Sequence, residues 1–380
     1  MRKIILLLPI VLSLILISIA FYPQAQLPPI KVGILHSLTG TMATSEKPVM
    51  QATLLAIEKI NAQGGLLGRR IQPIIVDGES NADTFAQQAE YLITQEHVSV
   101  IFGCWTSASR KMVKPIVEKY QNLLFYPLQY EGLEASPNII YMGAAPNQQI
   151  IPAVFWAIQT FGPRIYLVGS DYVFPRVASW LIHKQAPILN AAVIGEHYIP
   201  LGATDMSQVI SDLQRLKPDV IINSINGDSN IAFFTALQEA NITAHDIPVL
   251  SLSMGEVELS NIQKKVNITG HYAAWSYFQS IDTPENKSFV QAYQTRYGQN
   301  LPVSDPMESA WNAVHLWAQA ARAAQTDDTA TVRQTIRHQS FISPEGIVSI
   351  DTHSQHAWKT ARIGQVQDNG QFHILWSSAQ

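Results

Sequence analysis

The sequence predicts an α/β protein built from two doubly wound parallel-sheet lobes. Short apolar runs typical of buried strands alternate with amphipathic helical stretches along residues 30–147. The same alternation starts again after Pro146-Asn147 and continues to about residue 251. At 380 residues, the chain is also longer than one ordinary hydrophobic core supports. Two lobes in series therefore explain the pattern most economically.

In the first half, each predicted strand ends in a polar loop that leads into a helix. One helix carries Val113, Ile116, Val117 and Tyr120 at the i, i+3, i+4, i+7 spacing of a single buried face. The strands are predicted at residues 30–35, 71–77, 98–103 and 123–126. Strands in such an order, separated by helices, form a parallel sheet with helices on both faces.

The second half repeats this rhythm and then becomes less regular. Strands are predicted at residues 164–169, 192–199, 219–223 and 249–251. Beyond them, residues 271–277 are strand-like, and residues 286–297 and 306–324 have helical spacing. A terminal antiparallel group is predicted at residues 346–351, 360–367 and 371–376, with Asp368-Asn-Gly370 as a hairpin turn.

Residues 1–20 are predicted to be a signal peptide or an N-terminal membrane anchor. Arg2 and Lys3 precede an apolar run, and Ser18-Ile-Ala20 offers a small-x-small cleavage site. The run is also long enough to span a bilayer if it is retained. Either alternative places the folded part in the periplasm or another extracytoplasmic space. Since no cysteine lies near this segment, a lipoprotein is not expected.

Composition narrows the class of protein further. Apolar residues make up 47% of the chain and charged residues 14%, which is typical of a compact fold and excludes a disordered chain. The net charge of −4, without a basic stripe, argues against a nucleic-acid partner. Cys104 is the single cysteine, so no internal disulfide can form.

No pattern in the sequence indicates an enzyme, a metal site or a cofactor. Nucleophile-elbow, phosphate-loop and zinc-protease motifs are missing from it. Cys104 has no histidine or basic residue placed to activate it and is interpreted as a small buried hydrophobe. His353 and His356 are interpreted as solvated or capping residues rather than metal ligands. Glu256 and Glu258 fit the first turn of a helix, although a general-acid role stays open for them.

A recognition pattern remains at the predicted strand ends, where parallel sheets bind ligands. Flat aromatic faces with neutral amides, hydroxyls and one or two carboxylates suit a small, planar, uncharged polar ligand. Arg110 is the one nearby residue that could clamp an anion, and an ion-pairing role on the helix surface or between the lobes is favoured for it. The residues that make up this pattern are Trp105, Ser107, Tyr126, Gln129, Tyr130, Tyr172, Asn226 and Asp228.

Several runs resemble the periplasmic-binding-protein type I superfamily, and more narrowly the urea-binding proteins of urea ABC transporters and their short-chain-amide-binding relatives. The runs are GILHSLTGTMA, INAQGGLLGR, FGCWTSASRK, FYPLQYEGLEASPNIIYMGAAPNQQ, LVGSDYVFPR, NSINGDSN, YFQSID and SPEGIVSID. The resemblance implies two lobes joined by a three-crossover hinge that closes on a ligand. It implies lobe 1 at residues 28–147 plus about 276–338, and lobe 2 at residues 148–275 plus about 339–380.

Position by position, the resemblance also implies a binding pocket between the lobes. Trp105 and Tyr126 would sandwich a planar ligand, and Ser107 would donate to its carbonyl group. Gln129, Asn226 and Asp228 would accept from its N–H groups. The complete expected set is Trp105, Thr106, Ser107, Tyr126, Gln129, Tyr130, Asp171, Tyr172, Asn226, Gly227, Asp228 and Ser253.

The function expected from residues and resemblance together is capture of urea or a short-chain amide for an ABC transporter permease. One alternative is a ligand sensor that signals to a receptor or regulator, and another is a protein that binds a branched-chain amino acid. An amide-hydrolysing enzyme is disfavoured because no nucleophile lies beside a base.

Overall fold

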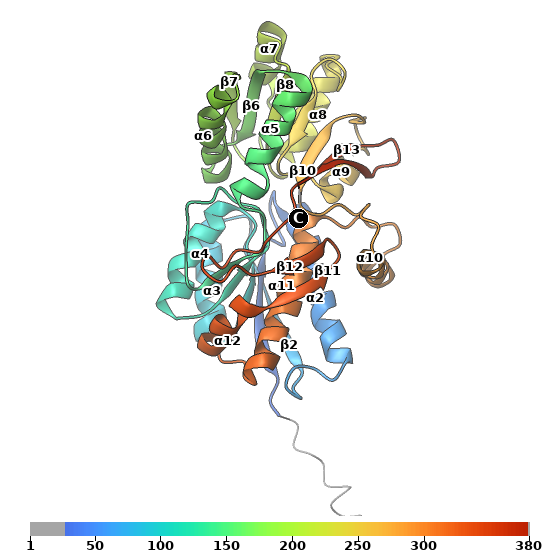
Figure 1. Ribbon diagram of the computed structural model, residues 1–380. Helices are drawn as coiled ribbons and strands as arrows, with labels where there is room; N and C mark the ends of the chain where they lie inside the picture. Colours follow the sequence, from blue (N-terminus) through green and yellow to red (C-terminus); the bar gives the residue numbers. More distant parts are fainter. Residues whose placement is uncertain (1–26, 379–380) are drawn as a thin grey trace, which may run out of the picture.

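The structure, a computed structural model, describes residues 27–378 and forms two lobes, one above the other in Figure 1. The first lobe is built on a five-stranded sheet of order β2-β1-β3-β4-β5, in which all neighbours are parallel. Its strands are β1 (Ile30–His36), β2 (Ile71–Asp77), β3 (Ile101–Gly103), β4 (Leu124–Tyr126) and β5 (Ile139–Tyr141). The doubly wound parallel sheet predicted for this half is confirmed.

Helices cover this sheet and bury its apolar residues. Helix α11 packs against α2 and also contacts β3 and β4, so it lies in the middle of the first core. Its Trp317 meets Phe102 of β3 edge-on, with ring centroids 5.8 Å apart. The helices of this lobe are α2 (Ala43–Ala62), α3 (Ala82–Thr94), α4 (Ser107–Lys119), α10 (Pro284–Tyr297), α11 (Asp305–Ala324) and α12 (Thr329–Thr335).

The second lobe is built on a seven-stranded sheet of order β14-β13-β10-β9-β8-β6-β7. Strands β6 to β10 pair in parallel, whereas β13 is antiparallel to both β10 and β14. The strands are β6 (Arg164–Ser170), β7 (Ala192–Ile199), β8 (Val220–Ser224), β9 (Val249–Ser251), β10 (Tyr272–Trp275), β13 (Arg362–Val366) and β14 (Phe372–Ser377). The helices are α5 (Ile150–Phe161), α6 (Val173–Ile188), α7 (Ser207–Leu216), α8 (Ser229–Glu239) and α9 (Glu256–Ile262).

The chain passes between the lobes three times, near residues 142–150, 275–277 and 357–363. In each case one end of the segment is buried in the first core and the other end in a core of the second lobe. The hairpin of β11 (Ser340–Ser343) and β12 (Gly346–Ser349) differs from the expected boundary near residue 339. Because Val348, Ile350 and Ala357 are buried in the first core, this segment belongs to the first lobe.

The terminal antiparallel group is therefore smaller than predicted. Strand β12 pairs with β11 instead of joining β13 and β14. The turn predicted at Asp368-Asn-Gly370 does connect β13 to β14, with Val366 opposite Phe372. The predicted signal peptide or anchor, residues 1–20, lies outside the described residues. Within residues 27–378, no helix combines the length and the apolarity needed to cross a membrane.

Buried charges fix the second and third crossovers to the start of α11. The carboxylate of Asp305 accepts from the backbone N–H groups of Ser276 (3.0 Å) and Tyr277 (2.8 Å) in the second crossover. Lys359, in the third crossover, has a fully buried ammonium group that pairs with Glu308 at 3.4 Å and with Glu345. A buried cation needs such partners, because an unpaired charge in a protein interior is strongly unfavourable.

This arrangement predicts that Lys359→Met destabilises the protein, because it leaves Glu308 buried without its cation and Glu345 with only the more distant Arg362 at 3.8 Å. We expect the free energy of unfolding to fall by about 3–5 kcal/mol. The measurement is guanidinium chloride denaturation. Lys287→Met is the matched control: it breaks a pair with Asp282 that is exposed and screened by solvent, so it should change stability far less than Lys359→Met. Equal losses in the two variants would contradict the role given to Lys359.

Candidate ligand-binding site

The predicted site residues gather where the two sheets face each other. In the first lobe they follow β3 and β4, and in the second lobe they follow β6, β8 and β9. These are carboxyl ends of parallel strands, the position at which open α/β sheets bind ligands. The loops from both lobes meet there, so the site is formed by the lobes together.

Four of the predicted residues make direct contacts between the lobes. The indole N–H of Trp105 donates to Oδ1 of Asn226 at 3.3 Å. Nε2 of Gln129 donates to the carbonyl of Leu252 at 3.0 Å and to Oγ of Ser253 at 3.3 Å. All four predicted side chains are buried, and the structure therefore has the lobes in contact.

The loop after β3 is held in place by its own polar groups. The hydroxyl of Tyr126 donates to the carbonyl of Trp105 at 2.6 Å, which ties the end of β4 to this loop. Thr106 is the N-cap of α4, and its Oγ1 accepts from the backbone N–H of Ser109 at 3.0 Å. Cys104 is fully buried, and burial raises the pKa of its thiol, which confirms its interpretation as a packing residue.

On the second lobe, Asn226 is fixed by bonds to its own lobe. Its backbone N–H donates to Oγ of Ser170 at 3.0 Å, and its Nδ2 donates to the carbonyl of Ser224 at 3.2 Å. Tyr172 is half-buried beside it, and burial raises the pKa of its phenol well above the usual value. The neighbouring Tyr126 and Glu131 raise that pKa further, so Tyr172 stays neutral.

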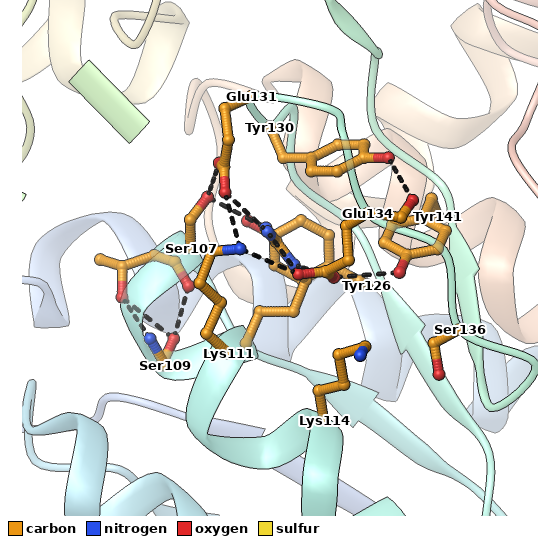
Figure 2. A network of polar contacts seen from close by, with 12 residues as sticks. Ser107, Ser109, Lys111, Lys114, Tyr126, Tyr130, Glu131, Glu134, Ser136 and Tyr141 are labelled. Carbon is orange, nitrogen blue, oxygen red and sulfur yellow. Dashed lines mark hydrogen bonds and ion pairs between the residues drawn. The ribbon is translucent and has the colours of Figure 1, made fainter. Parts of the chain in front are cut away.

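Sequence reasoning missed the buried ion network behind this site. Arg110 lies in α4, and its Nη1 donates to Oγ of Ser107 at 2.9 Å. Its Nη2 donates to Oε1 of Glu131 at 3.0 Å, and its Nε donates to Oε1 of Glu134 at 2.9 Å. Figure 2 shows the carboxylate groups of Glu131 and Glu134 together with Ser107, which donates its hydroxyl hydrogen to Glu131. Arg110 does form ion pairs, as predicted, but it is fully buried and its partners lie in its own lobe, so the expected position on the helix surface or between the lobes is wrong.

The charges of this network balance one another. The Arg110 guanidinium lies 4.8 Å from the ring centroid of Tyr126 and 4.6 Å from that of Tyr130. Burial alone would raise the pKa of Glu134, but Arg110 and Lys111 overcome it and lower that pKa to about 2. Lys111 also pairs with Glu131 at 3.4 Å. Two cations thus face two carboxylates, and the network as a whole is neutral.

Two roles implied by the resemblance need correction. The hydroxyl of Ser107 has one hydrogen, and that hydrogen goes to Glu131, so in this arrangement Ser107 cannot also donate to a ligand carbonyl. One face of the Tyr126 ring is covered by Arg110, which leaves only the other face for a planar ligand.

Two predicted residues, Asp171 and Tyr130, do not contact the opposite lobe directly, and a third, Asp228, is exposed. Asp171 is exposed and pairs with Arg176 at 2.6 Å. Asp228 stands at the start of α8, where it lines a wide surface pocket of about 1130 Å³ on the second lobe and also a small pocket that it shares with Thr44 and Ser45 of the first lobe. Tyr130 stacks on Tyr141 within the first lobe, with centroids 4.9 Å apart, and its hydroxyl contacts His356.

Gly227, in contrast, faces the opposite lobe closely. A Cβ added there would lie 3.1 Å from the carbonyl oxygen of Thr41, and the backbone has a φ of +67°. Glycine tolerates both the close approach and the left-handed conformation. Across residues 27–378, no group of three His, Cys, Asp or Glu side chains could hold a metal ion.

Comparison with known proteins agrees with this geometry. Residues 30–380 match the family model described as a periplasmic binding protein domain. The chain belongs to this family. Among curated proteins, the Leu/Ile/Val-binding protein homolog 6 of Brucella melitensis is 22% identical to this periplasmic binding protein, over 90% of each chain. The limonene hydroxylase of Geobacillus stearothermophilus is 37% identical over 111 residues, which cover 29% of this chain and 20% of the hydroxylase.

Solved structures share the fold of this periplasmic binding protein. A solute-binding protein of an ABC transporter from R. palustris, in complex with 4-hydroxybenzoate, has a TM-score of 0.82 and 21% identity, covering 93% of this chain and 97% of its own. A branched-chain amino acid transporter substrate-binding protein from Streptococcus pneumoniae, in complex with isoleucine, has a TM-score of 0.80 and 19% identity, covering 92% and 98%. At these identities, the similarity establishes the fold alone.

The geometry predicts that Asn226→Ala destabilises the protein more than Asp228→Ala does. The first change removes the buried acceptor of the Trp105 indole N–H, and an unpaired buried group costs about 1–3 kcal/mol. The second change alters an exposed side chain and should cost less than about 0.5 kcal/mol. Guanidinium chloride denaturation measures both. Similar losses in the two variants would mean that Asn226 does not connect the lobes.

Proposed function

We propose that this protein captures urea or a short-chain amide between its lobes and delivers it to an ABC transporter permease. The observation that carries the proposal is Oε1 of Gln129. This oxygen is buried at the contact between the lobes and has no hydrogen-bond partner among the described residues. A buried acceptor calls for an N–H donor, and urea and simple amides present N–H groups on a small planar frame.

The charge balance around the site also favours a neutral ligand. Arg110 is a buried cation that bonds to the site residue Ser107, and the carboxylates of Glu131 and Glu134 neutralise it. A ligand with a carboxylate group is normally bound by a cation that can form a bidentate pair with it. Because Arg110 is already paired on both sides, an uncharged ligand fits this site better.

Discrimination between ligands with and without N–H groups would come from polar groups of the protein that lose water when the lobes close. Gln129, Asn226 and Ser253 are buried in the closed arrangement, and each polar atom without a partner costs about 1–3 kcal/mol. A ligand that lacks N–H groups would leave Oε1 of Gln129 unpaired. Sites of this kind reject analogues that cannot form the expected hydrogen bonds.

Transport then follows from a shift between open and closed forms. A ligand that contacts both lobes stabilises the closed form in proportion to its preference for that form. The permease would recognise the closed form on the extracytoplasmic side of the membrane. A sensor or regulator as the receiving partner remains an alternative, with the same ligand and the same closure.

A branched-chain amino acid is the second candidate ligand, because relatives that cover 90% and 81% of the chain are named Leu/Ile/Val-binding protein homologs. An amino acid carries a carboxylate that would have to compete with Glu131 and Glu134 for Arg110. Calorimetric titration with urea, acetamide, isoleucine and 4-hydroxybenzoate separates these possibilities. We expect a heat of binding when urea or acetamide is titrated into the protein. Binding of isoleucine without a response to either amide would overturn the proposal.

The role of Gln129 has its own test in Gln129→Leu. This variant keeps the approximate volume but removes the acceptor Oε1 and the donor Nε2 that bonds to Leu252 and Ser253, so we expect the Kd for urea or acetamide to rise at least tenfold, as measured by calorimetry. Gln214→Leu, an equivalent change at an exposed position in α7, is the control and should keep the wild-type Kd. An unchanged Kd in Gln129→Leu would remove Gln129 from the site.

A further inference from the structure

We propose that Glu131 sets the selectivity of this site for neutral ligands over carboxylates. Its carboxylate occupies the hydrogen-bond donors of Ser107 and Arg110 that an acidic ligand would need. Glu131 thus takes the place that the carboxylate of an acidic ligand would occupy. The inference rests on the proposed function and deepens it, since it names the residue that makes the site an amide site rather than an acid site.

The geometry around Ser107 carries this inference. Ser107 is the first residue of α4, and Arg110 lies one turn later, so both side chains reach the same point. The hydroxyl of Ser107 accepts from Nη1 of Arg110 at 2.9 Å and donates to Oε2 of Glu131. Oε1 of Glu131 accepts from Nη2 of Arg110 at 3.0 Å. One hydroxyl and one guanidinium edge thus hold both oxygens of a single carboxylate, as they would hold the carboxylate of a bound acid.

The two glutamates of the network have different surroundings. Glu131 bonds to Ser107, which directly follows the cleft residues Trp105 and Thr106. The charge of Glu131 also contributes to the raised pKa of Tyr172 on the opposite lobe. Glu134 instead bonds to Tyr141 at 2.9 Å and to the half-exposed Lys111 at 3.1 Å, within the first lobe. Figure 2 shows Glu131 beside Ser107, and Glu134 beside Lys111 and Tyr141. Of the two, only Glu131 engages Ser107.

Electrostatics then determine which ligands the site accepts. Arg110 and Glu131 are both buried, so little solvent screens a charge brought next to them. A ligand carboxylate near Ser107 would face the Glu131 carboxylate directly and would find the donors of Arg110 occupied. A neutral amide brings no such repulsion. Glu131 therefore excludes acids even though a cation lies in the same cluster.

The test compares acetamide with acetate, which have almost the same shape and differ in charge. Calorimetry should give wild-type protein at least 100-fold tighter binding of acetamide than of acetate. In Glu131→Gln, which keeps the shape and removes the charge, we expect this ratio to fall at least tenfold, because the carboxylate that repels acetate is gone and Arg110 keeps only Glu134 as a buried anionic partner. Thermal unfolding of each variant confirms that it is folded before titration.

Glu134→Gln is the charge-matched control. It removes the same charge from the same arginine but leaves the bond between Ser107 and Glu131, so the ratio should stay within threefold of wild type. An unchanged ratio in Glu131→Gln, or an equal fall in both variants, would overturn the inference while leaving amide binding in place.

The wild-type ratio serves as a second measurement that does not depend on any variant folding. If wild-type protein binds acetate as tightly as acetamide, Glu131 does not exclude acids, even if amide binding itself is established. If wild-type protein binds isoleucine and neither urea nor acetamide, the proposed function fails. The inference then fails with it, because a carboxylate would have been accepted with Glu131 in place.

Discussion

The buried guanidinium of Arg110 is the constraint around which this site is organised. A cation removed from water must be paired, and here Glu131, Glu134 and the hydroxyl of Ser107 supply its partners, while the rings of Tyr126 and Tyr130 cover it. Glu131 and Glu134 come from the loop after β4, so the network fixes that loop against the start of α4. Gln129 lies in the same loop and is thereby held where it meets the second lobe.

Two different kinds of polar contact hold the lobes together. The hinge side is held by buried charges, with Asp305, Lys359 and Glu345 linking the second and third crossovers to α11. The ligand side includes contacts between neutral groups, such as those of Trp105 with Asn226 and of Gln129 with Ser253, together with a buried bond from Ser45 to Glu258. Neutral contacts between lobes are individually weak, which suits a surface that has to open and close. The charged groups lie where the chain crosses between the lobes.

Much of this architecture could be predicted from the sequence, because strand and helix periods depend on local spacing. The strand ends placed Trp105, Gln129, Asn226 and Ser253 at the right edge of each sheet. The ion network could not be predicted in the same way: Glu131 and Glu134 lie 21 and 24 residues beyond Arg110, and no local period brings them together. The local signal that the sequence offered for this network was the three-residue spacing of Glu131 and Glu134. The exposure of Asp228 could not be predicted from its position at a strand end, and β12 was misplaced because burial against the first core outweighs proximity in sequence.

The central claim is that a neutral ligand is recognised by the acceptor of Gln129 while Glu131 keeps its place on Arg110. A crystal structure of the protein grown with urea tests both parts at once. The account predicts a urea nitrogen about 2.7–3.2 Å from Oε1 of Gln129, with the carboxylate of Glu131 still bonded to Ser107 and Arg110. Urea bound elsewhere, or Glu131 displaced from Arg110 by the ligand, would contradict it.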